Sequence, residues 1–466
     1  MNRIAIVIII CLLTGISACD KSIDEFLDKA PGVDLVEDDI FSRRLNTEGY
    51  VSTLYQFGMV SIFPNRDPLV TSSPTGATSA LIGTLSGATD ESENQQIFGF
   101  ANVWNSGNVQ SNSIISNEDT RYFARWKAIR IANILLERID EVPDADTTYR
   151  KQVKGEALFI RALQNFETLK RYGGFPIVNI RFKSADSAIA PRSTFEESVN
   201  AIIKDCDTAA FNLKNVTYNT SQTGRATRLA ALALKSRTLL YAASPIFNTG
   251  TPYLSMTDPA NNNLICYSNF DANRWKLAAD AAMAVLVEAP SFGVSLIDVP
   301  TNRNPTPAAR SQGNYWIAWE QRDNDEIIIA DKTYGPSATF GYPWYHIVPN
   351  GLNSFITGNS VTHTFVSKYE DTLGNVPFWN PAGDTDLVRK YGQLDSRFKQ
   401  SVAYNRSRWN AQFPVIETFI GATQTINNPG GAWMIKHIPE GLANGGSVAP
   451  SIALYRLNEF YLNYAE

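Results

Sequence analysis

Residues 161–176 read RALQNFETLKRYGGFP, and this stretch decides the fold. Gly173-Gly174 followed by Pro176 is the order in which helices end, because glycine accepts the left-handed turn and proline cannot continue a helix. Upstream of this stop, apolar side chains recur at helical spacing along one face, namely Phe159, Ala162, Leu163, Phe166 and Leu169. The pattern predicts a helix over 149–172 whose apolar face packs against a neighbouring helix.

Working outward, other stretches show the same spacing, and Thr194 with Glu197 has the pattern of a capping box. The predicted helices fall into pairs, as in tetratricopeptide repeat proteins, but long insertions interrupt the period of about 34 residues. We therefore predict a mostly α-helical fold, an irregular tetratricopeptide-like scaffold of helical pairs. The further helices are expected near 129–139, 194–213, 229–243 and 275–286, and the insertions near 174–193, 214–227 and 244–270.

Two regions depart from the helical pattern. Residues 58–118 are rich in Gly, Ser, Thr, Asn and Pro, which predicts a loop insertion. Residues 291–450 mix loops with short β-prone runs such as 326–330, and they hold six of the nine tryptophans. We expect an N-terminal helical scaffold over 19–290 and a loop-rich, aromatic-rich second lobe with minor β structure over 291–466, ending in a partial scaffold helix.

The composition narrows the possible functions. The 466 residues have a formal net charge of −5 and a sequence pI of about 5.5, whereas a nucleic-acid partner would require a basic face. The three histidines, His346, His363 and His437, lack the spacing of metal ligands. We expect neither a nucleic-acid partner nor a multi-histidine metal centre.

The first 18 residues predict a cleaved lipoprotein signal peptide. Arg3 precedes an apolar run over 4–13, and residues 16–19, ISAC, resemble a bacterial lipobox, in which the cysteine is acylated. Cys19 is therefore predicted to be the lipidated N-terminus of the mature chain, held at a membrane by its acyl chains. The alternative is a plain secretory signal with a chance cysteine.

Cysteines and arginines within the predicted helical scaffold are expected to be structural. Cys206 and Cys266 could form a disulfide in an exported protein, but nothing in the sequence places them close together, so we favour two free thiols. Neighbouring aspartates should raise the pKa of Cys206 and blunt its reactivity. Three arginines on or beside helices are expected to contact carboxylates or helix ends: Arg161, Arg225 and Arg237.

The motifs along the chain resemble the SusD/RagB family of Bacteroidetes outer-membrane lipoproteins. The stretch 161–176 is the most specific of them, and the others follow in the family's order over nearly the whole mature chain. Ser396 stands where the family usually has proline. The accompanying motifs are DEFLDKAP at 24–31, ATDE at 88–91, the helix at 126–136, GRAT at 224–227, LYAASPIFN at 240–248, LDSRF at 394–398 and the segment 455–466.

The resemblance implies a non-enzymatic binding protein without a cofactor. Family members sit over a SusC-like, TonB-dependent transporter and present glycans, or in some members peptides, for import. It also implies an outer-membrane lipoprotein, anchored by the lipid on Cys19 and facing the cell exterior. In the family a further helical segment follows the last helix, so a chain that stops at Glu466 is expected to be C-terminally truncated.

Sugar chemistry singles out candidate ligand residues. A sugar ring has apolar C–H faces, which suit flat aromatic rings, and polar edges, which suit amides and carboxylates. Asp90 and Glu91 could bind sugar hydroxyls or a structural calcium ion, and the alternative for them is turn capping and solvation. For each tryptophan the alternative is core packing. The candidate rings are Trp104, Trp316, Trp319, Tyr342, Trp344 and Tyr345.

Other functional classes remain open at this point. A glycoside hydrolase needs two carboxylates roughly 5–10 Å apart, and the 46 acidic residues are too many for counting to exclude such a pair. However, the sequence has no G-x-S-x-G, H-E-x-x-H or P-loop motif. A peptide-binding protein, or a scaffold subunit that grips the transporter and binds no ligand, is the alternative within the resemblance.

Overall fold

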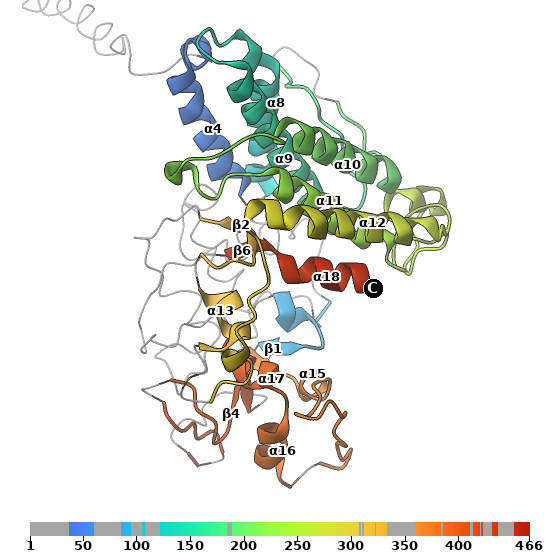
Figure 1. The fold of residues 1–466 in the computed structure, drawn as a ribbon. Coiled ribbons are helices and arrows are strands. Elements are labelled where there is room, and N and C mark those ends of the chain that lie inside the picture. Colours follow the sequence, from blue (N-terminus) through green and yellow to red (C-terminus); the bar gives the residue numbers. More distant parts are fainter. Residues whose placement is uncertain are drawn as a thin grey trace, which may run out of the picture.

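Figure 1 shows the fold in a computed structural model of the chain. Its upper part is an array of helices, and its lower part holds short helices and strands joined by loops. The mostly α-helical fold with minor β structure is confirmed. The structure describes residues 37–59, 85–94, 105–107, 122–183, 189–306, 309, 312–321, 323–332, 359–383, 385–410, 413–419, 421–422, 431–436 and 452–466.

Consecutive helices pack against one another in the upper part, with α8 against α9, α9 against α10, α10 against α11 and α11 against α12. Short 3-10 turns, η2 to η7, lie in the segments between the helices. The helices are α3 (Glu37–Phe41), α4 (Arg44–Gly58), α8 (Tyr122–Arg138), α9 (Thr147–Tyr172), α10 (Phe195–Asn212), α11 (Arg228–Ala243) and α12 (Asn273–Glu288). The 3-10 turns are η2 (Leu85–Ala88), η3 (Ile139–Glu141), η4 (Thr220–Gln222), η5 (Pro259–Leu264), η6 (Ala289–Phe292) and η7 (Pro300–Asn302).

The lower part contains two small antiparallel sheets. One has the strand order β1-β3-β5-β4, and the other pairs β2 with β6. The strands are β1 (Ser92–Asn94), β2 (Ile327–Asp331), β3 (Asn359–Val361), β4 (Val402–Tyr404), β5 (Ala432–Met434) and β6 (Ile452–Arg456). The helices of this part are α13 (Asn314–Glu320), α15 (His363–Val366), α16 (Leu387–Gln393), α17 (Ser396–Ser401) and α18 (Leu457–Ala465).

Helix α9 is buried on all sides over most of its length. The predicted apolar stripe is buried, but so are polar residues on its other faces, among them Gln152, Glu156 and Gln164. The predicted packing of the apolar face is confirmed, and the other faces are buried as well, because α4, α8, α10 and α11 all contact this helix. Each polar side chain on α9 must therefore find its partner inside the protein.

The helix ends follow the predicted signals. At the start of α10, the Glu197 N–H donates to Thr194 Oγ1 at 3.1 Å, and the Thr194 N–H donates to Glu197 Oε2 at 2.9 Å, which completes the capping box. At the end of α9, Gly173 has φ +72°. A Cβ there would lie 2.5 Å from the carbonyl oxygen of Leu264, so only glycine fits.

The end of the described chain returns to the helical array. Strand β6 pairs with β2, and α18 follows directly and packs against α12 (Figure 1). Arg237 on α11 holds this last segment against the helical array, because its guanidinium donates to Glu459 Oε1 at 2.6 Å and to the carbonyl oxygen of Leu454 at 2.7 Å. The same guanidinium lies 4.0 Å from the ring centroid of Tyr455.

The spacing of apolar residues near Glu466 predicts one helical stripe that includes Leu454, and this prediction is wrong. Because Arg456 is the N-cap of α18 and the residues before it belong to β6, the helix starts later than the periodicity suggested. Its buried residues are Leu457 and Phe460, whereas Tyr461 and Tyr464 are about half exposed. The incorrect stripe comprised Leu454, Leu457, Tyr461 and Tyr464.

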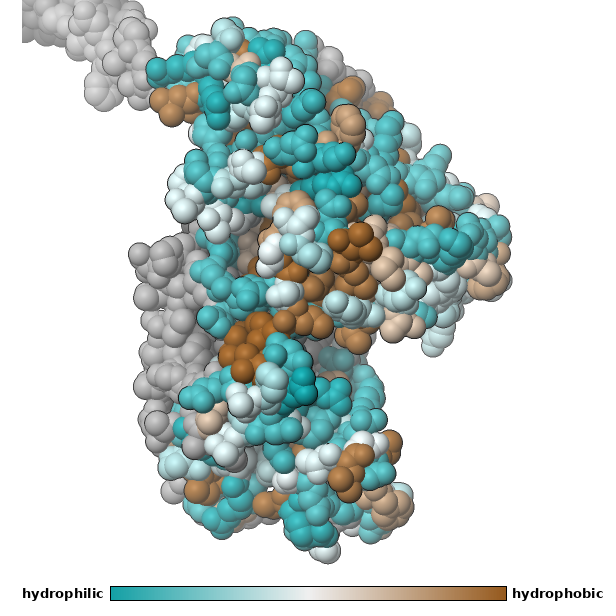
Figure 2. Space-filling model, in the orientation of Figure 1, coloured by the Kyte–Doolittle hydropathy of each residue, from teal (hydrophilic) through white to brown (hydrophobic). Residues whose placement is uncertain are grey.

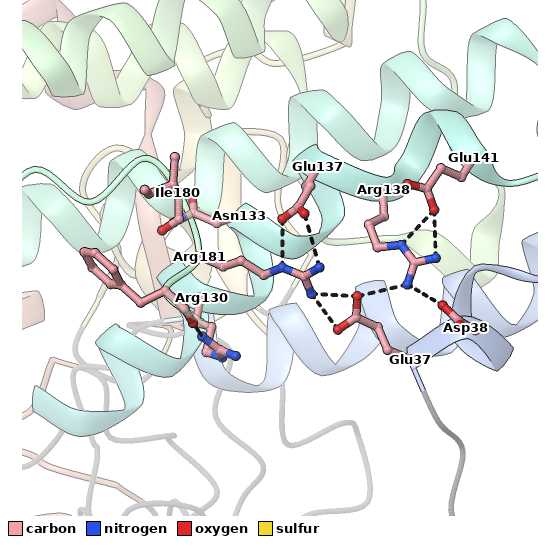
Figure 3. A network of polar contacts seen from close by, with 10 residues as sticks. Glu37, Asp38, Arg130, Asn133, Glu137, Arg138, Glu141, Ile180 and Arg181 are labelled. Carbon is pink, nitrogen blue, oxygen red and sulfur yellow. Dashed lines mark hydrogen bonds and ion pairs between the residues drawn. The ribbon is translucent and has the colours of Figure 1, made fainter. Parts of the chain in front are cut away.

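An ion-pair network joins α3 to α8 (Figure 3). Arg181, in the segment after α9, contacts Glu37 Oε2 at 2.5 Å and Glu137 Oε2 at 2.8 Å. Arg138 contacts Glu37 at 2.9 Å and Glu141 at 2.7 Å. The hydrogen bond from Arg181 lowers the pKa of Glu37. The network ties the first described helix to the helical array.

A buried ion pair joins α9 to α10. The Arg161 guanidinium donates to both carboxylate oxygens of Asp205, each at 2.7 Å, and to Asn133 Oδ1 on α8 at 2.7 Å. All three residues are less than a tenth exposed. Asn133 in turn donates to the carbonyl oxygens of Val178 and Ile180; Figure 3 shows Asn133 beside Ile180. Through the guanidinium of Arg161, this series of hydrogen bonds links α8, α9, α10 and the segment after α9.

We predict that Arg161→Met destabilises the protein by about 3–5 kcal/mol, because Asp205 would remain buried without its cation. Urea denaturation measures the effect as a lower unfolding midpoint. The double variant Arg161→Met/Asp205→Leu should regain most of the loss, since no buried charge is left.

The matched control is Lys276→Met, which removes an exposed pair with Asp280 and should cost less than about 1 kcal/mol. Equal midpoints for Arg161→Met and Lys276→Met would contradict the assigned role of the buried pair.

Candidate functional site

The predicted ligand residues fall into two groups. Trp104 and the run Tyr342, Trp344 and Tyr345 lie outside the described residues, as does the predicted lipidation residue Cys19. Their roles stay predictions. The structure does describe Asp90, Glu91, Trp316 and Trp319, all of which lie in or beside the lower part of the fold.

Asp90 and Glu91 form the turn that leads into β1. The side chain of Asp90 pairs with Lys368 at 3.0 Å, and both side chains are more than half exposed. The hydrogen bond from Lys368 lowers the pKa of Asp90. The carbonyl oxygen of Glu91 accepts the Thr362 N–H at 3.0 Å, which continues the pairing of β1 with β3. The side chain of Asp90 thus forms an exposed ion pair, and the roles of Asp90 and Glu91 in ligand binding stay predictions.

Trp316 lies on α13 and is 5% exposed. Its backbone N–H donates to Oε1 of the buried Gln400 on α17 at 3.0 Å. Gly313, just before α13, leaves room for this approach, since a Cβ there would come within 2.1 Å of the same oxygen. The ring of Trp316 therefore lies in the core in this structure, which is the packing alternative.

Trp319, one turn further along α13, contacts two cations. Lys436 Nζ lies 3.4 Å from its ring centroid, and the guanidinium carbon of Arg456 lies 3.7 Å from it. Lys436 also donates to the hydroxyl of Tyr315 at 3.1 Å. Although burial opposes ionisation, the ammonium of Lys436 holds the pKa of Tyr315 below its usual value.

Tyr315, Trp319, Lys436 and Arg456 together are called the Trp319 cluster here. Each cation–π contact contributes about 0.5–2 kcal/mol, so the ring already has an internal role. Arg456 Nη1 donates to the carbonyl oxygen of Ala318 at 2.8 Å and fixes β6 to α13. Sequence reasoning missed this cluster, because Lys436 and Arg456 approach the ring from segments more than 100 residues away. The family motif at 455–466 contained Arg456 but not its partner.

The three scaffold arginines are confirmed as structural. Arg161 pairs with Asp205, and Arg237 pairs with Glu459. Arg225 pairs with Glu48 on α4 at 2.5 Å and with Glu156 on α9 at 3.5 Å. All of them contact carboxylates from other helices.

A polar cluster surrounds Glu156, which is fully buried. Its Oε1 accepts from Gln152 at 2.8 Å and lies 3.2 Å from the hydroxyl oxygen of Tyr218. Tyr149 donates to Glu48 Oε2 at 3.0 Å in the same region. Burial raises the pKa of Glu156, even though the nearby Arg225 opposes this shift.

Glu156 is the carboxylate with a raised pKa among the described residues, which is a property expected of a glycosidase acid. A general acid must reach the glycosidic oxygen to protonate it. Because Glu156 has no exposed surface, it cannot reach a bound sugar in this structure. Its position suits a structural role.

The remaining expectations concern thiols, metals and membranes. Cys206 and Cys266 are free and buried, as expected, and burial with the neighbouring aspartates raises the pKa of Cys206. Within the described ranges, no three His, Cys, Asp or Glu side chains gather in a way that could hold a metal ion. None of the described helices combines the length and the apolar character needed to cross a bilayer.

Comparisons with known proteins place two family matches on the chain. The SusD-like family described as "Starch-binding associating with outer membrane" matches residues 59–240, and the SusD family matches residues 316–466. A SusD-like protein of Formosa agariphila is 29% identical over 309 residues. That match covers 63% of this chain and 52% of the relative, so it spans about half the length of that protein.

Solved structures share the fold at low identity. A SusD-like protein from Bacteroides fragilis has a TM-score of 0.67 and 20% identity, covering 94% of this chain and 77% of its own. A SusD-like carbohydrate binding protein from the same species has a TM-score of 0.58 and 15% identity, over 91% of this chain and 74% of its own. Surface glycan-binding protein A from Bacteroides fluxus has a TM-score of 0.54 and 15% identity, covering 91% of this chain and 76% of its own.

The raised pKa of Glu156 predicts a pH-dependent stability. A carboxyl whose pKa rises on folding stabilises the folded state below its unfolded pKa, and this contribution is lost as the pH rises through the folded pKa. Glu156→Gln keeps the shape of the side chain but cannot ionise, so the variant does not lose this stability as the pH rises. The stability of the variant relative to the native protein should therefore increase with pH.

Urea midpoints of both proteins between about pH 4 and pH 8 measure this difference. Carboxyls with lowered pKa values, such as Glu37, have the opposite dependence but are identical in both proteins, so they cancel. A difference between the two proteins that does not change with pH would contradict the prediction.

Proposed function

The chain belongs to the SusD/RagB family, and we propose that it is a non-enzymatic, glycan-binding lipoprotein of the cell surface. In this proposal it delivers oligosaccharides to a SusC-like, TonB-dependent transporter of the outer membrane. The observation that supports it most is the pair of family matches, which fall in order on both halves of the chain. One of those families is described as starch-binding and associated with the outer membrane.

The chemistry of the described residues favours binding over hydrolysis. Glycoside hydrolysis needs an acid with a raised pKa that faces a second carboxylate across an open cleft. Glu156 is enclosed by tyrosines and a glutamine, and the exposed Asp90 has a lowered pKa and is paired with Lys368. Neither Glu156 nor Asp90 therefore has the properties required of the general acid in a glycosidase.

We further propose that the run Tyr342, Trp344 and Tyr345, together with Trp104, supplies the rings on which sugars stack. Trp316 and Trp319 are not assigned to stacking in this proposal, because their rings are engaged within the protein. The exposed carboxylate of Asp90, with the neighbouring Glu91, is proposed to accept hydrogen bonds from sugar hydroxyls.

The lipid on Cys19 is proposed to anchor the mature chain in the outer membrane with its body facing the exterior. Replacing Cys19 with Ser should abolish acylation and release the protein from the membrane fraction. Fractionation and intact-mass measurement test this, with Cys206→Ser as the matched control that leaves acylation intact. A wild-type protein whose mass shows an unmodified cysteine would contradict the proposal.

Trp344→Ala should weaken glycan binding by about 1–3 kcal/mol, by analogy with base–aromatic stacking. Calorimetry with oligosaccharides selected on a glycan array measures the change. Trp275→Ala removes a half-buried ring from α12 in the helical array and is the matched control, with unchanged affinity. Equal affinities of wild type and Trp344→Ala would remove Trp344 from the site.

The same purified protein separates the rival functions. Glycans bound without released product support the binding protein, whereas released sugar would establish a hydrolase. Binding of peptides in place of glycans would identify a peptide-binding member. Co-purification with the transporter and no ligand binding at all would leave a scaffold subunit.

A further inference from the structure

A polar pocket lies in the helical part of the fold, and its lining includes none of the described ligand candidates Asp90, Glu91, Trp316 and Trp319. It has a volume of about 370 Å³, within the range of small-molecule sites. It is formed by the first residues of α4 and α9 and by the loop between α10 and α11, which runs beside α4 (Figure 1). Its lining residues are Arg44, Asp146, Thr148, Tyr149, Gln152, Thr217, Tyr218, Asn219 and Gln222.

The floor of this pocket is held in place by buried partners. Tyr149 and Gln152 are 2% and 6% exposed, and they donate to Glu48 and to Glu156 respectively. The hydroxyl of Tyr218 donates to the carbonyl oxygen of Ala226 at 2.6 Å. Such hydrogen bonds fix the side chains before a ligand arrives, which reduces the entropy that binding would cost.

The wall of the pocket is anchored as well. Gln222 donates to Glu48 Oε1 at 3.4 Å, so the loop is tied to α4 across the pocket. Asn219 caps the short η4 turn by accepting the Ser221 N–H at 3.0 Å. The loop residues that line the pocket therefore have defined positions.

The charge of the lining restricts what could bind. Arg44 and Asp146 are its charged residues, and they lie 3.7 Å apart with opposite signs. The other lining side chains are neutral hydroxyls, amides and tyrosines. Such a lining offers both donors and acceptors without a net charge, which suits a neutral ligand with many hydroxyl groups and disfavours a strongly charged or apolar one.

The aromatic face of Tyr149, one of the lining residues, is already covered by Arg44. The guanidinium of Arg44 lies 4.2 Å from the ring centroid of Tyr149. The pocket therefore presents hydrogen-bonding groups more than open aromatic faces. It would hold a small polar molecule by its edges, in contrast to the ring-stacking site proposed above.

We propose that this pocket is a second ligand site, which takes one neutral, hydroxyl-rich unit of about monosaccharide size. The proposal does not depend on the stacking rings, and it can hold or fail separately from the proposed function. Its occupant makes hydrogen bonds to the amides of Gln152, Asn219 and Gln222 and to the hydroxyls of Thr148 and Thr217.

Saturation-transfer NMR with D-glucose, D-galactose and D-xylose as separate probes tests the proposal on the whole mature protein. At least one of these sugars should bind saturably. Thr217→Phe fills the pocket from an exposed loop position and should abolish that binding. Thr208→Phe, an exposed change on α10 outside the pocket, is the matched control and should leave it unchanged.

A second variant guards against misfolding. Thr148→Val/Thr217→Val removes two of the lining hydroxyls at nearly constant volume and should weaken binding by about tenfold, with an unchanged circular dichroism spectrum. Glucuronate and glucosamine should bind more weakly than glucose, because the pocket has no net charge.

Three results would overturn the proposal. One is no saturable binding of any of the neutral sugars to the wild-type protein. Another is binding that survives Thr217→Phe. The last is binding that is lost in Trp344→Ala but kept in Thr217→Phe, which would assign the sugar to the stacking rings and support the proposed function alone.

Discussion

The structure depends on the burial of the central part of α9. Four helices surround this helix, and residues 155–169 have no face left for water. A charged or polar group in such a place is costly unless it is paired and hydrogen-bonded. The protein meets this constraint with arginines from different elements: Arg161 of α9 pairs with Asp205 of α10, and Arg225 reaches from the α10–α11 loop to Glu156. The positions of the neighbouring helices follow from these pairs as much as from apolar packing.

Contacts made by arginines also join the helical array to the lower part of the fold. Arg237 on α11 holds Glu459 of α18, while Arg456 at the end of β6 lies over Trp319 of α13. Because both contacts fall within a few residues of each other, the segment 452–466 links the helical array to the lower part. Figure 2 shows brown, hydrophobic surface where α12 and α18 lie in Figure 1, and a mostly hydrophilic surface around α4. Val287 of α12 is an apolar residue that is 71% exposed.

These contacts change how the aromatic residues are interpreted. A high tryptophan content outside the helices suggested ring platforms for sugars, yet Trp316 is buried and Trp319 contacts cations. Part of the aromatic content of the lower part therefore serves packing. The polar pocket at the start of α9 illustrates the converse, because groups that the buried Glu156 network holds in place also line an open pocket without a net charge.

The sequence by itself indicated five helices of the array, near 129–139, 149–172, 194–213, 229–243 and 275–286, because apolar spacing, Thr194 with Glu197, and Gly173 act within a few residues. It did not indicate α3 or α4. It also indicated the structural arginines and the free thiols, since these follow from local context and the family motifs. Only the tertiary structure decided that the central part of α9 has no free face and that α18 begins after Arg456. It alone revealed the Trp319 cluster and the polar pocket, because their members come from segments far apart in the chain and meet only when the fold brings them together.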